Sequence, residues 1–133
     1  MTAEIRPILI PVSAGELLDK ISILEIKAER ITSPEKLAHV QHELALLRQV
    51  RDEAQLTGSS VELLARHLKT INETLWNIED DIRECERHKD FGEKFVALAR
   101  DVYTTNDRRS KTKHEINFLT SSGIVEVKSY AQY

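Results

Sequence analysis

Residues 61–85 read VELLARHLKTINETLWNIEDDIREC, and an apolar residue recurs along them at alternating steps of three and four. The recurring positions are Val61, Leu64, Leu68, Ile71, Leu75, Ile78, Ile82 and Cys85. Such a repeat forms one continuous apolar seam along an α-helix and is typical of helices that pack at shallow angles in bundles. The stretch therefore predicts a long, core-facing helix in an all-α protein.

Signals for the start of a helix occur four times along the chain. Three have capping-box spacing and one is a serine before proline: Ser13 with Glu16, Ser59 with Glu62, Asp90 with Glu93, and Ser33 with Pro34. The predicted helices span about residues 14–31, 34–55, 60–88 and 91–120. Short turns between them favour an up-down antiparallel four-helix bundle, which we expect to form a single domain over residues 1–133.

Short extended segments are predicted at both ends of the chain. Residues 8–10 lie between Pro7 and Pro11, and a strand flanked by prolines can only lie at the edge of a sheet. Residues 124–130 follow Gly123, a predicted helix C-cap, and are rich in β-branched side chains. Because the termini of an up-down bundle lie at the same end, the two segments could pair as a two-stranded ribbon.

The composition fits a helical protein and argues against several classes of function. Hydrophobic residues make up 41% and charged residues 31% of the 133 residues. The net charge of -3 argues against nucleic acid and against an anionic membrane surface as partners. Cys85 is the only cysteine, so we expect neither an internal disulfide nor a cysteine metal cluster. Without a signal-peptide pattern or an apolar run long enough to span a bilayer, the expectation is a cytoplasmic protein, and no cofactor is predicted.

The last predicted helix carries an interrupted seam. Its apolar positions give way to three polar residues at the same spacing and then resume: Phe91, Phe95, Leu98 and Val102, then Thr105, Arg109 and Thr112, then Ile116 and Leu119. Buried polar groups persist only with partners, so in a continuous helix Arg109 must pair with a carboxylate or bind a ligand. Alternatively, Thr104 with Asp107 would start a new helix, and Arg109 would reach water at the break.

A polar pocket is predicted between the first and the last helix. Antiparallel packing brings together Glu16, Asp19, Lys20 and Lys27 on one side and Asn106, Arg109, Lys113 and Asn117 on the other. The expected register sets Glu16 near Asn117, Asp19 near His114, Lys20 near Lys113 and Lys27 near Asn106. Arginine presents a planar fork of donors that suits phosphate and carboxylate groups. These residues are therefore a candidate binding site for a small anion such as phosphate or a sugar phosphate. A structural ion-pair network would use the same residues.

Basic residues also face one another across the predicted hairpin of the two long helices. Antiparallel pairing sets one group against the other: Arg66, His67 and Lys69 opposite Arg108, Arg109, Lys111 and Lys113. This cluster would extend an anion site, or its members would point into solvent, as charge runs on helices usually do.

A polar and aromatic stripe lies beside the seam of the helix at 60–88, formed by Asn72, Trp76, Glu79 and Arg83. The hairpin pairing sets Trp76 opposite Tyr103, and Glu79 opposite Arg100. Two interpretations are open. The aromatic pair and the ion pair would lock the hairpin, or the aromatic residues would form a platform for a sugar or a base.

Two carboxylate pairs support an alternative function. Glu16 with Asp19, and Glu79 with Asp80, resemble the helical carboxylates that hold Mg²⁺ in all-helical nucleotide pyrophosphohydrolases. The alternative is therefore a metal-dependent hydrolase of nucleotides or sugar nucleotides. Lysines and arginines intrude among these carboxylates and the histidines lack zinc-site spacing, so no metal site is predicted.

The predicted helix lengths differ enough to leave an overhang. The last two helices would be about 45 Å long and the first two about 27–33 Å. At its turn the longer hairpin would then expose an apolar seam comprising Ile78, Ile82, Cys85, Phe91, Phe95 and Leu98. Apolar surface of that extent is usually covered, so we expect a homodimer, unless the shorter helices tilt over the seam.

Four groups of residues carry a resemblance to a known family: GELLDKI at 15–21 with Lys27; NE, LW and IED between 72 and 80; AR, VY and ND between 99 and 107; and KSY at 128–130. Together they resemble a small bacterial family of uncharacterised all-helical proteins, associated with sugar-transfer and surface-polysaccharide genes. The resemblance implies no catalytic residue. It favours a binding or accessory protein with a phosphorylated sugar as ligand or a glycosyltransferase as partner.

Overall fold

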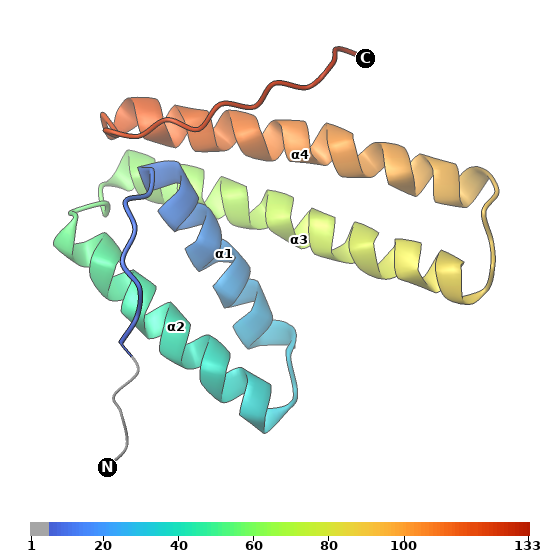
Figure 1. Ribbon diagram of the computed structural model, residues 1–133, viewed down its shortest axis with the longest axis horizontal. Helices are drawn as coiled ribbons and strands as arrows, with labels where there is room; N and C mark the ends of the chain where they lie inside the picture. The colour runs from blue at the N-terminus through green and yellow to red at the C-terminus, as the bar shows by residue number, and fades with distance from the viewer. Residues whose placement is uncertain (1–5) are drawn as a thin grey trace.

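The computed structural model describes residues 6–133. It contains four helices: α1 (Ala14–Arg30), α2 (Pro34–Glu53), α3 (Ser59–Arg87) and α4 (Glu93–Leu119). Successive helices run in opposite directions (Figure 1), so the predicted all-α, up-down four-helix bundle is confirmed. The helix at 93–119 is continuous, and the break considered at 104–107 does not occur.

The helix ends are set by local backbone and side-chain hydrogen bonds. The Ser13 hydroxyl accepts a hydrogen bond from the Glu16 N–H at 3.1 Å, as predicted for an N-cap. Two other predicted caps were wrong, because Gly58 and Gly92 take the N-cap positions of α3 and α4. Asp90 instead accepts a hydrogen bond from the Gly92 N–H at 3.1 Å.

Three of the helices end in the same kind of turn. Gln55, Lys89 and Ser121 follow α2, α3 and α4 and have φ values of 58°, 56° and 52°. In each turn the next residue donates its N–H to a carbonyl five residues earlier, the Schellman arrangement: Leu56 to Arg51, Asp90 to Cys85 and Ser122 to Asn117. The predicted C-cap at Gly123 was therefore wrong, because the left-handed residue after α4 is Ser121.

Helix α1 is the central element of the bundle. It packs against α2, α3 and α4, whereas α2 approaches only α1 closely. Leu17, Leu18, Ile21 and Leu24 form the core face of α1 and are all at most 5% exposed. Beneath α1, the seam of the long hairpin is fully closed: Leu68, Ile71 and Ile116 have no exposed surface. The core therefore surrounds α1 and also includes Val40 and Leu44 of α2.

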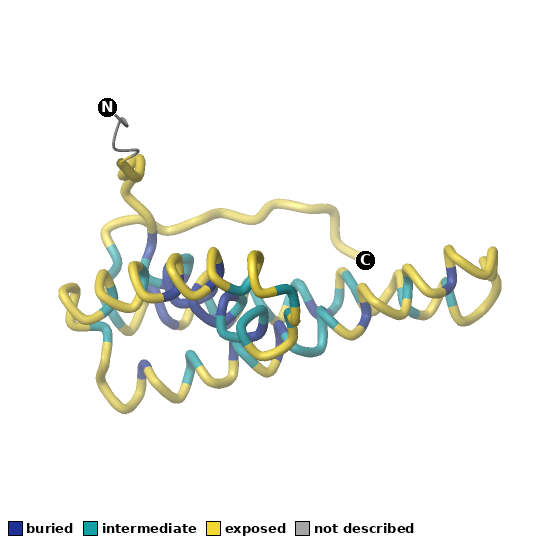
Figure 2. The backbone as a smooth tube through the Cα atoms, turned by 90° about the horizontal axis from the view of Figure 1, so that it is seen from below, coloured by how far each residue is buried: buried dark blue, intermediate teal, exposed yellow. Residues whose placement is uncertain are grey.

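The hairpin of α3 and α4 extends beyond the turn between α1 and α2 (Figures 1 and 2). In this overhang Ile78 and Cys85 are buried between the two helices, but Phe91 is 52% exposed. Its ring packs edge-on against Phe95, with 5.4 Å between ring centroids. The two shorter helices diverge from the long hairpin, so they do not cover the predicted overhang.

No strand forms among residues 6–133, so the ribbon considered for the chain ends does not occur. Both segments start at the same end of the bundle, but the segment after Ser121 runs along α4 and the one before Ser13 leaves on another side (Figure 1). Two prolines, Pro7 and Pro11, lack the N–H groups that a ladder needs. Side-chain contacts to the helices hold the C-terminal segment instead. We call residues 123–133 the tail.

Candidate functional site

Arg109, the polar residue in the seam of α4, forms a two-point ion pair with Asp19 of α1. Its Nε donates to Asp19 Oδ1 at 2.9 Å, and its Nη2 donates to Asp19 Oδ2. Asp19 is 1% exposed, whereas the Arg109 side chain is 29% exposed. The hydrogen bonds that Arg109 donates to Asp19 raise the pKa of Arg109 further above its ordinary value, so the guanidinium is always charged.

Helix α3 completes the surroundings of the buried carboxylate. Asn72 Nδ2 donates to Asp19 Oδ1 at 2.9 Å and to Ser22 Oγ at 2.8 Å. Ser22 Oγ in turn donates to the Asp19 backbone carbonyl at 2.7 Å. The side-chain network of Arg109, Asp19, Asn72 and Ser22 therefore joins α1, α3 and α4, and no buried side-chain polar atom of the described residues lacks a partner.

Of the other two polar residues of the seam, Thr112 is satisfied by the backbone of its own helix. Thr105 and Thr112 are 4% and 3% exposed, and Thr112 Oγ1 donates to the Arg108 carbonyl one turn earlier at 3.0 Å. Arg109 is therefore the polar residue of this seam whose side chain pairs with another helix.

Lys113 lies one turn beyond Arg109 and is held between two carboxylates. Its Nζ donates to Glu16 Oε2 at 2.6 Å, and both carboxylate oxygens of Glu126 lie 3.2 Å from it. The Lys113 side chain is only 14% exposed. Burial opposes its charge, but hydrogen bonds to Glu16 and Glu126 and the charge of Asp19 outweigh burial and raise the pKa of Lys113.

The first turn of α1 is docked directly onto α4. The Gly15 N–H donates to Asn117 Oδ1 at 2.7 Å, and both residues are buried. A Cβ on Gly15 would lie 2.6 Å from the Lys113 carbonyl oxygen and 2.9 Å from Asn117 Oδ1. Only glycine allows this approach, which fixes the register between α1 and α4.

This register differs by one helical turn from the predicted one. The sequence interpretation placed Glu16 near Asn117, but Glu16 pairs with Lys113, and Asp19 pairs with Arg109. The structure thus brings together Glu16, Asp19, Arg109, Lys113 and Asn117 as a group. Their role as a ligand site stays a prediction.

Lys20 and Lys27 lie at the margin of this group. Lys20 contacts Glu16 at 3.5 Å within α1, with half of its side chain exposed. Lys27 is half-buried and makes no ion pair with the described residues. Neither lysine lines the cavity described next.

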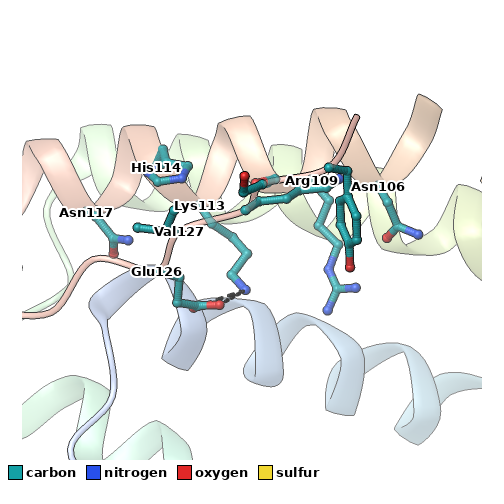
Figure 3. A pocket seen from close by; sticks show the side chains of 11 residues that line it. Asn106, Arg109, Lys113, His114, Asn117, Glu126 and Val127 are labelled. Carbon is teal, nitrogen blue, oxygen red and sulfur yellow. Dashed lines mark hydrogen bonds and ion pairs between the residues drawn. The ribbon is translucent and has the colours of Figure 1, made fainter. Parts of the chain in front are cut away.

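A cavity of about 580 Å³ lies between α4 and the tail. Figure 3 shows Arg109 and Lys113 pointing from α4 toward α1 at this cavity, with the tail passing close by. The lining combines three cationic side chains with amide, hydroxyl and imidazole groups: Asn106, Arg109, Ser110, Lys113, His114, Asn117, Glu126, Val127, Lys128, Ser129 and Tyr130. Asp19 and Glu16, the carboxylates behind Arg109 and Lys113, do not line it.

A second cavity of about 890 Å³ continues along the tail and shares five residues with the first. All three tyrosines of the chain line it. Tyr103 packs against Tyr133, with 5.0 Å between ring centroids, and Tyr133 Oη donates to Asp107 Oδ2 at 2.6 Å. Lys128 contacts Asp107 at 2.5 Å, so Asp107 anchors the far part of the tail.

Of the predicted stripe on α3, only Asn72 contacts the residues of the site. Asn72 joins the Asp19 network, but Trp76 packs beneath the Arg30 guanidinium, 5.7 Å from the ring centroid. Tyr103 pairs with Tyr133, so the expected pairing of Trp76 with Tyr103 was wrong. Glu79 pairs with Arg83 on its own helix rather than with Arg100.

The basic cluster expected across the long hairpin does not form. Arg66, His67, Arg108 and Lys111 are exposed. Lys69 turns to α1, where it pairs with Glu29 and lies 3.8 Å from Glu25. Arg109 and Lys113 also face α1 but contact different residues of it, because α1 lies over the groove between the two long helices.

The carboxylates of the hydrolase alternative do not converge. Glu16 and Asp19 are each paired with a cation from α4, and Glu79 and Asp80 are exposed on α3. Among residues 6–133, no group of three or more His, Cys, Asp or Glu side chains is arranged to hold a metal ion.

Sequence reasoning missed several residues of the site, most of them in the tail. Ser13 Oγ donates to Glu126 Oε1 at 3.2 Å, and the Ala14 N–H donates to Ser122 Oγ at 3.2 Å. The only signal in the sequence was the family-like KSY string at 128–130, because ion pairs between distant residues leave no periodic pattern.

The fold and the site define a helical-bundle protein with a buried ion-pair network and a cation-lined cavity beside its tail. The chain belongs to a family of unknown function, DUF6165, whose model matches residues 8–133. The predicted membership of an uncharacterised family is confirmed. No curated protein and no solved structure matches the chain. Among the described residues, no helix combines the length and apolar content needed to cross a membrane.

Proposed function

We propose that this protein is a helical binding protein that takes a small oxyanion, such as phosphate or a sugar phosphate, in the cavity between α4 and the tail. The observation that carries the proposal is the distribution of charge around Arg109 and Lys113. Both cations line the cavity, whereas Asp19 and Glu16, which pair with them, do not. The lining includes three cations and one carboxylate, a surplus of two positive charges.

The donors around these cations support an oxyanion rather than a neutral ligand. Arg109 uses Nε and Nη2 for Asp19, and its Nη1 donates to no acceptor among residues 6–133. Asn106, Ser110, His114 and Ser129 offer neutral donors in the same lining. A partly desolvated guanidinium with free N–H groups is a favourable partner for phosphate oxygens.

The size of the space supports a ligand larger than an inorganic ion. The cavity of about 580 Å³ is in the usual range for small-molecule sites and opens into the tyrosine-lined cavity. An aromatic lining of this kind suits the ring of a sugar. A phosphorylated sugar would place its phosphate near Arg109 and Lys113 and its ring near Tyr130.

Calorimetric titration at low ionic strength tests the proposal, with phosphate, pyrophosphate and hexose 1-phosphate as ligands. Replacing Lys113 by Met should weaken binding about tenfold, because a charge-assisted hydrogen bond is lost. The matched control is Lys94→Met, an exposed lysine of the same helix that lines neither cavity, which should change affinity by less than about twofold. Arg109→Lys keeps the charge but removes the planar fork, and should also weaken binding.

The proposal fails if none of the three anions binds, or if the variants at Lys113 and Lys94 lose affinity equally. The second result would mean that any binding reflects net charge alone. The structure does not support the hydrolase alternative, because Glu16, Asp19 and Glu79 each pair with a different cation and Asp80 is exposed.

A further inference from the structure

The carboxylate of Glu126 is bound by Ser13, which is buried, and by Lys113, which is mostly buried. Ser13 Oγ donates to Glu126 Oε1 at 3.2 Å, and Lys113 Nζ lies 3.2 Å from both of its oxygens. Ser13 is 1% exposed and the Lys113 side chain 14%, whereas the Glu126 side chain is 49% exposed. Ser13 and Lys113, which are packed within the helical part of the protein, thus bind a carboxylate from a solvent-exposed segment.

The tail that carries this carboxylate is attached through hydrogen bonds that all involve a side chain. Its residues are exposed throughout, and no backbone–backbone hydrogen bond joins residues 123–133 to the helices. Besides Glu126, the anchors are Lys128 and Tyr133, which both contact Asp107, and the Ile124 carbonyl, which accepts a hydrogen bond from Ser122 Oγ at 2.7 Å. No residue of the tail belongs to the apolar core, so release of the tail from α4 would not by itself open the core.

Glu126 lines the same cavity as Arg109 and Lys113. We propose that its carboxylate occupies the position of the ligand's charged group, so that an incoming oxyanion replaces Glu126 on Lys113 and Ser13 and releases the tail. The inference rests on the proposed function and specifies its binding subsite. The subsite comprises Ser13 Oγ and Lys113 Nζ, with the free Nη1 of Arg109 on the adjacent turn of α4.

A phosphate group fits this subsite better than a second carboxylate would. A terminal phosphate has three oxygens that accept hydrogen bonds, whereas a carboxylate has two. Phosphate can therefore bind Lys113 and Ser13 as Glu126 does and still offer an oxygen to Arg109. The shared chemistry is that of an oxyanion, and pyrophosphate and citrate serve as the phosphate and carboxylate probes.

The first test is the affinity of full-length Glu126→Gln for pyrophosphate. Removing the internal competitor should tighten binding about two- to fivefold, the range expected for release of a partly exposed ion pair. The matched control is Glu43→Gln, which removes the same charge from an exposed position on α2 and should leave affinity unchanged. If citrate gains as much as pyrophosphate, the subsite selects oxyanions in general and not phosphate.

The second test follows the tail itself. Trypsin cleaves after Lys128, and mass spectrometry reports the loss of residues 129–133 from the intact protein. Pyrophosphate should accelerate this cleavage in the wild type, because displacement of Glu126 frees the tail. Cleavage of Glu126→Gln should be fast without ligand. Protection of Lys128 by pyrophosphate would overturn the inference, because the tail would then close over the ligand.

The two proposals fail in different ways. If the wild type binds pyrophosphate and Glu126→Gln binds it equally or more weakly, the role of Glu126 is wrong and the anion site stands. If neither protein binds any probe, the proposed function is wrong and the inference falls with it. If Glu126→Gln binds pyrophosphate and the wild type does not, the result supports both the anion site and the role of Glu126 as its internal competitor.

Discussion

Asp19 and Arg109 lie 90 residues apart in the chain and meet through two parallel hydrogen bonds. The pair joins the central helix to the last one, and Asn72 of α3 binds the same carboxylate. Replacing only one partner of such an ion pair lowers the folding stability, because the remaining charge loses its partner in a low-dielectric site. The two partners differ in exposure, and this difference leads to the first prediction.

Replacing Arg109 by Met should cost more stability than replacing Asp19 by Asn. The first change leaves a carboxylate that is 1% exposed, whereas the second leaves a guanidinium whose side chain is 29% exposed and can be hydrated. We expect losses in unfolding free energy of about 3 kcal/mol and about 1–2 kcal/mol, measured by urea denaturation. The exposed Arg108→Met serves as control, and a larger loss for Asp19→Asn would contradict this account.

Replacing Gly15 by Ala should destabilise the protein by about 1–3 kcal/mol, as overpacking usually does. The added Cβ would lie 2.6 Å from the Lys113 carbonyl oxygen, a backbone atom that cannot move alone. Helix propensity by itself would make Gly15→Ala more stable than the wild type, whereas the steric contact of the added Cβ would make it less stable. The sign of the change in stability therefore separates the two explanations. Gly123→Ala is the control, because nothing lies within 4 Å of its Cβ position. A Gly15→Ala protein with an unchanged or higher melting temperature would contradict the close approach.

The contribution of Glu16 to stability should disappear at acidic pH. Burial opposes its ionised form, but the hydrogen bond from Lys113 and the charges of Lys113 and Lys20 outweigh burial and lower the pKa of Glu16 below its ordinary value. An acid whose pKa is lowered on folding stabilises the protein above its unfolded pKa, and the stabilisation is lost as pH falls through the folded pKa. The wild type should therefore be more stable than Glu16→Gln at pH 7, and the difference should shrink below about pH 4.5.

Urea denaturation at several pH values measures this difference. Glu43→Gln, at an exposed position of α2, shows how much of the change is due to net charge. A difference between wild type and Glu16→Gln that stays constant from pH 7 to pH 3 would show that the ion pair with Lys113 contributes nothing.

A homodimer through the overhang of α3 and α4 stays a prediction. The seam that has no exposed surface under α1 continues into the overhang, where Phe91 is 52% exposed. Light scattering should give a dimer for the wild type and a monomer for Phe95→Asp, because a charge would be placed in the interface. Phe118→Asp is the control, since Phe118 is 91% exposed near the opposite end of α4. A monomeric wild type would end this interpretation.

The sequence predicted the helices because the signals that define them are local. Steps of three and four residues from Val61 to Cys85, and the serine before α1, act within one or two turns of the chain. The interrupted seam likewise singled out Arg109, because the period of a helix determines which residues face a core. The same reasoning found the overhang, since helix length follows directly from residue number.

Only the tertiary structure decided which residues meet. Gly15 allows α1 to approach α4 so closely that Glu16 reaches Lys113 and Asp19 reaches Arg109, one turn away from the expected register. Periodicity does not determine how far one helix slides along another, because every turn repeats the same pattern. The position of Glu126 depends on its two contacts, with Lys113 and with Ser13, in an irregular segment. These contacts follow from the packed surfaces of α1 and α4, and no local property of residues 123–133 specifies them.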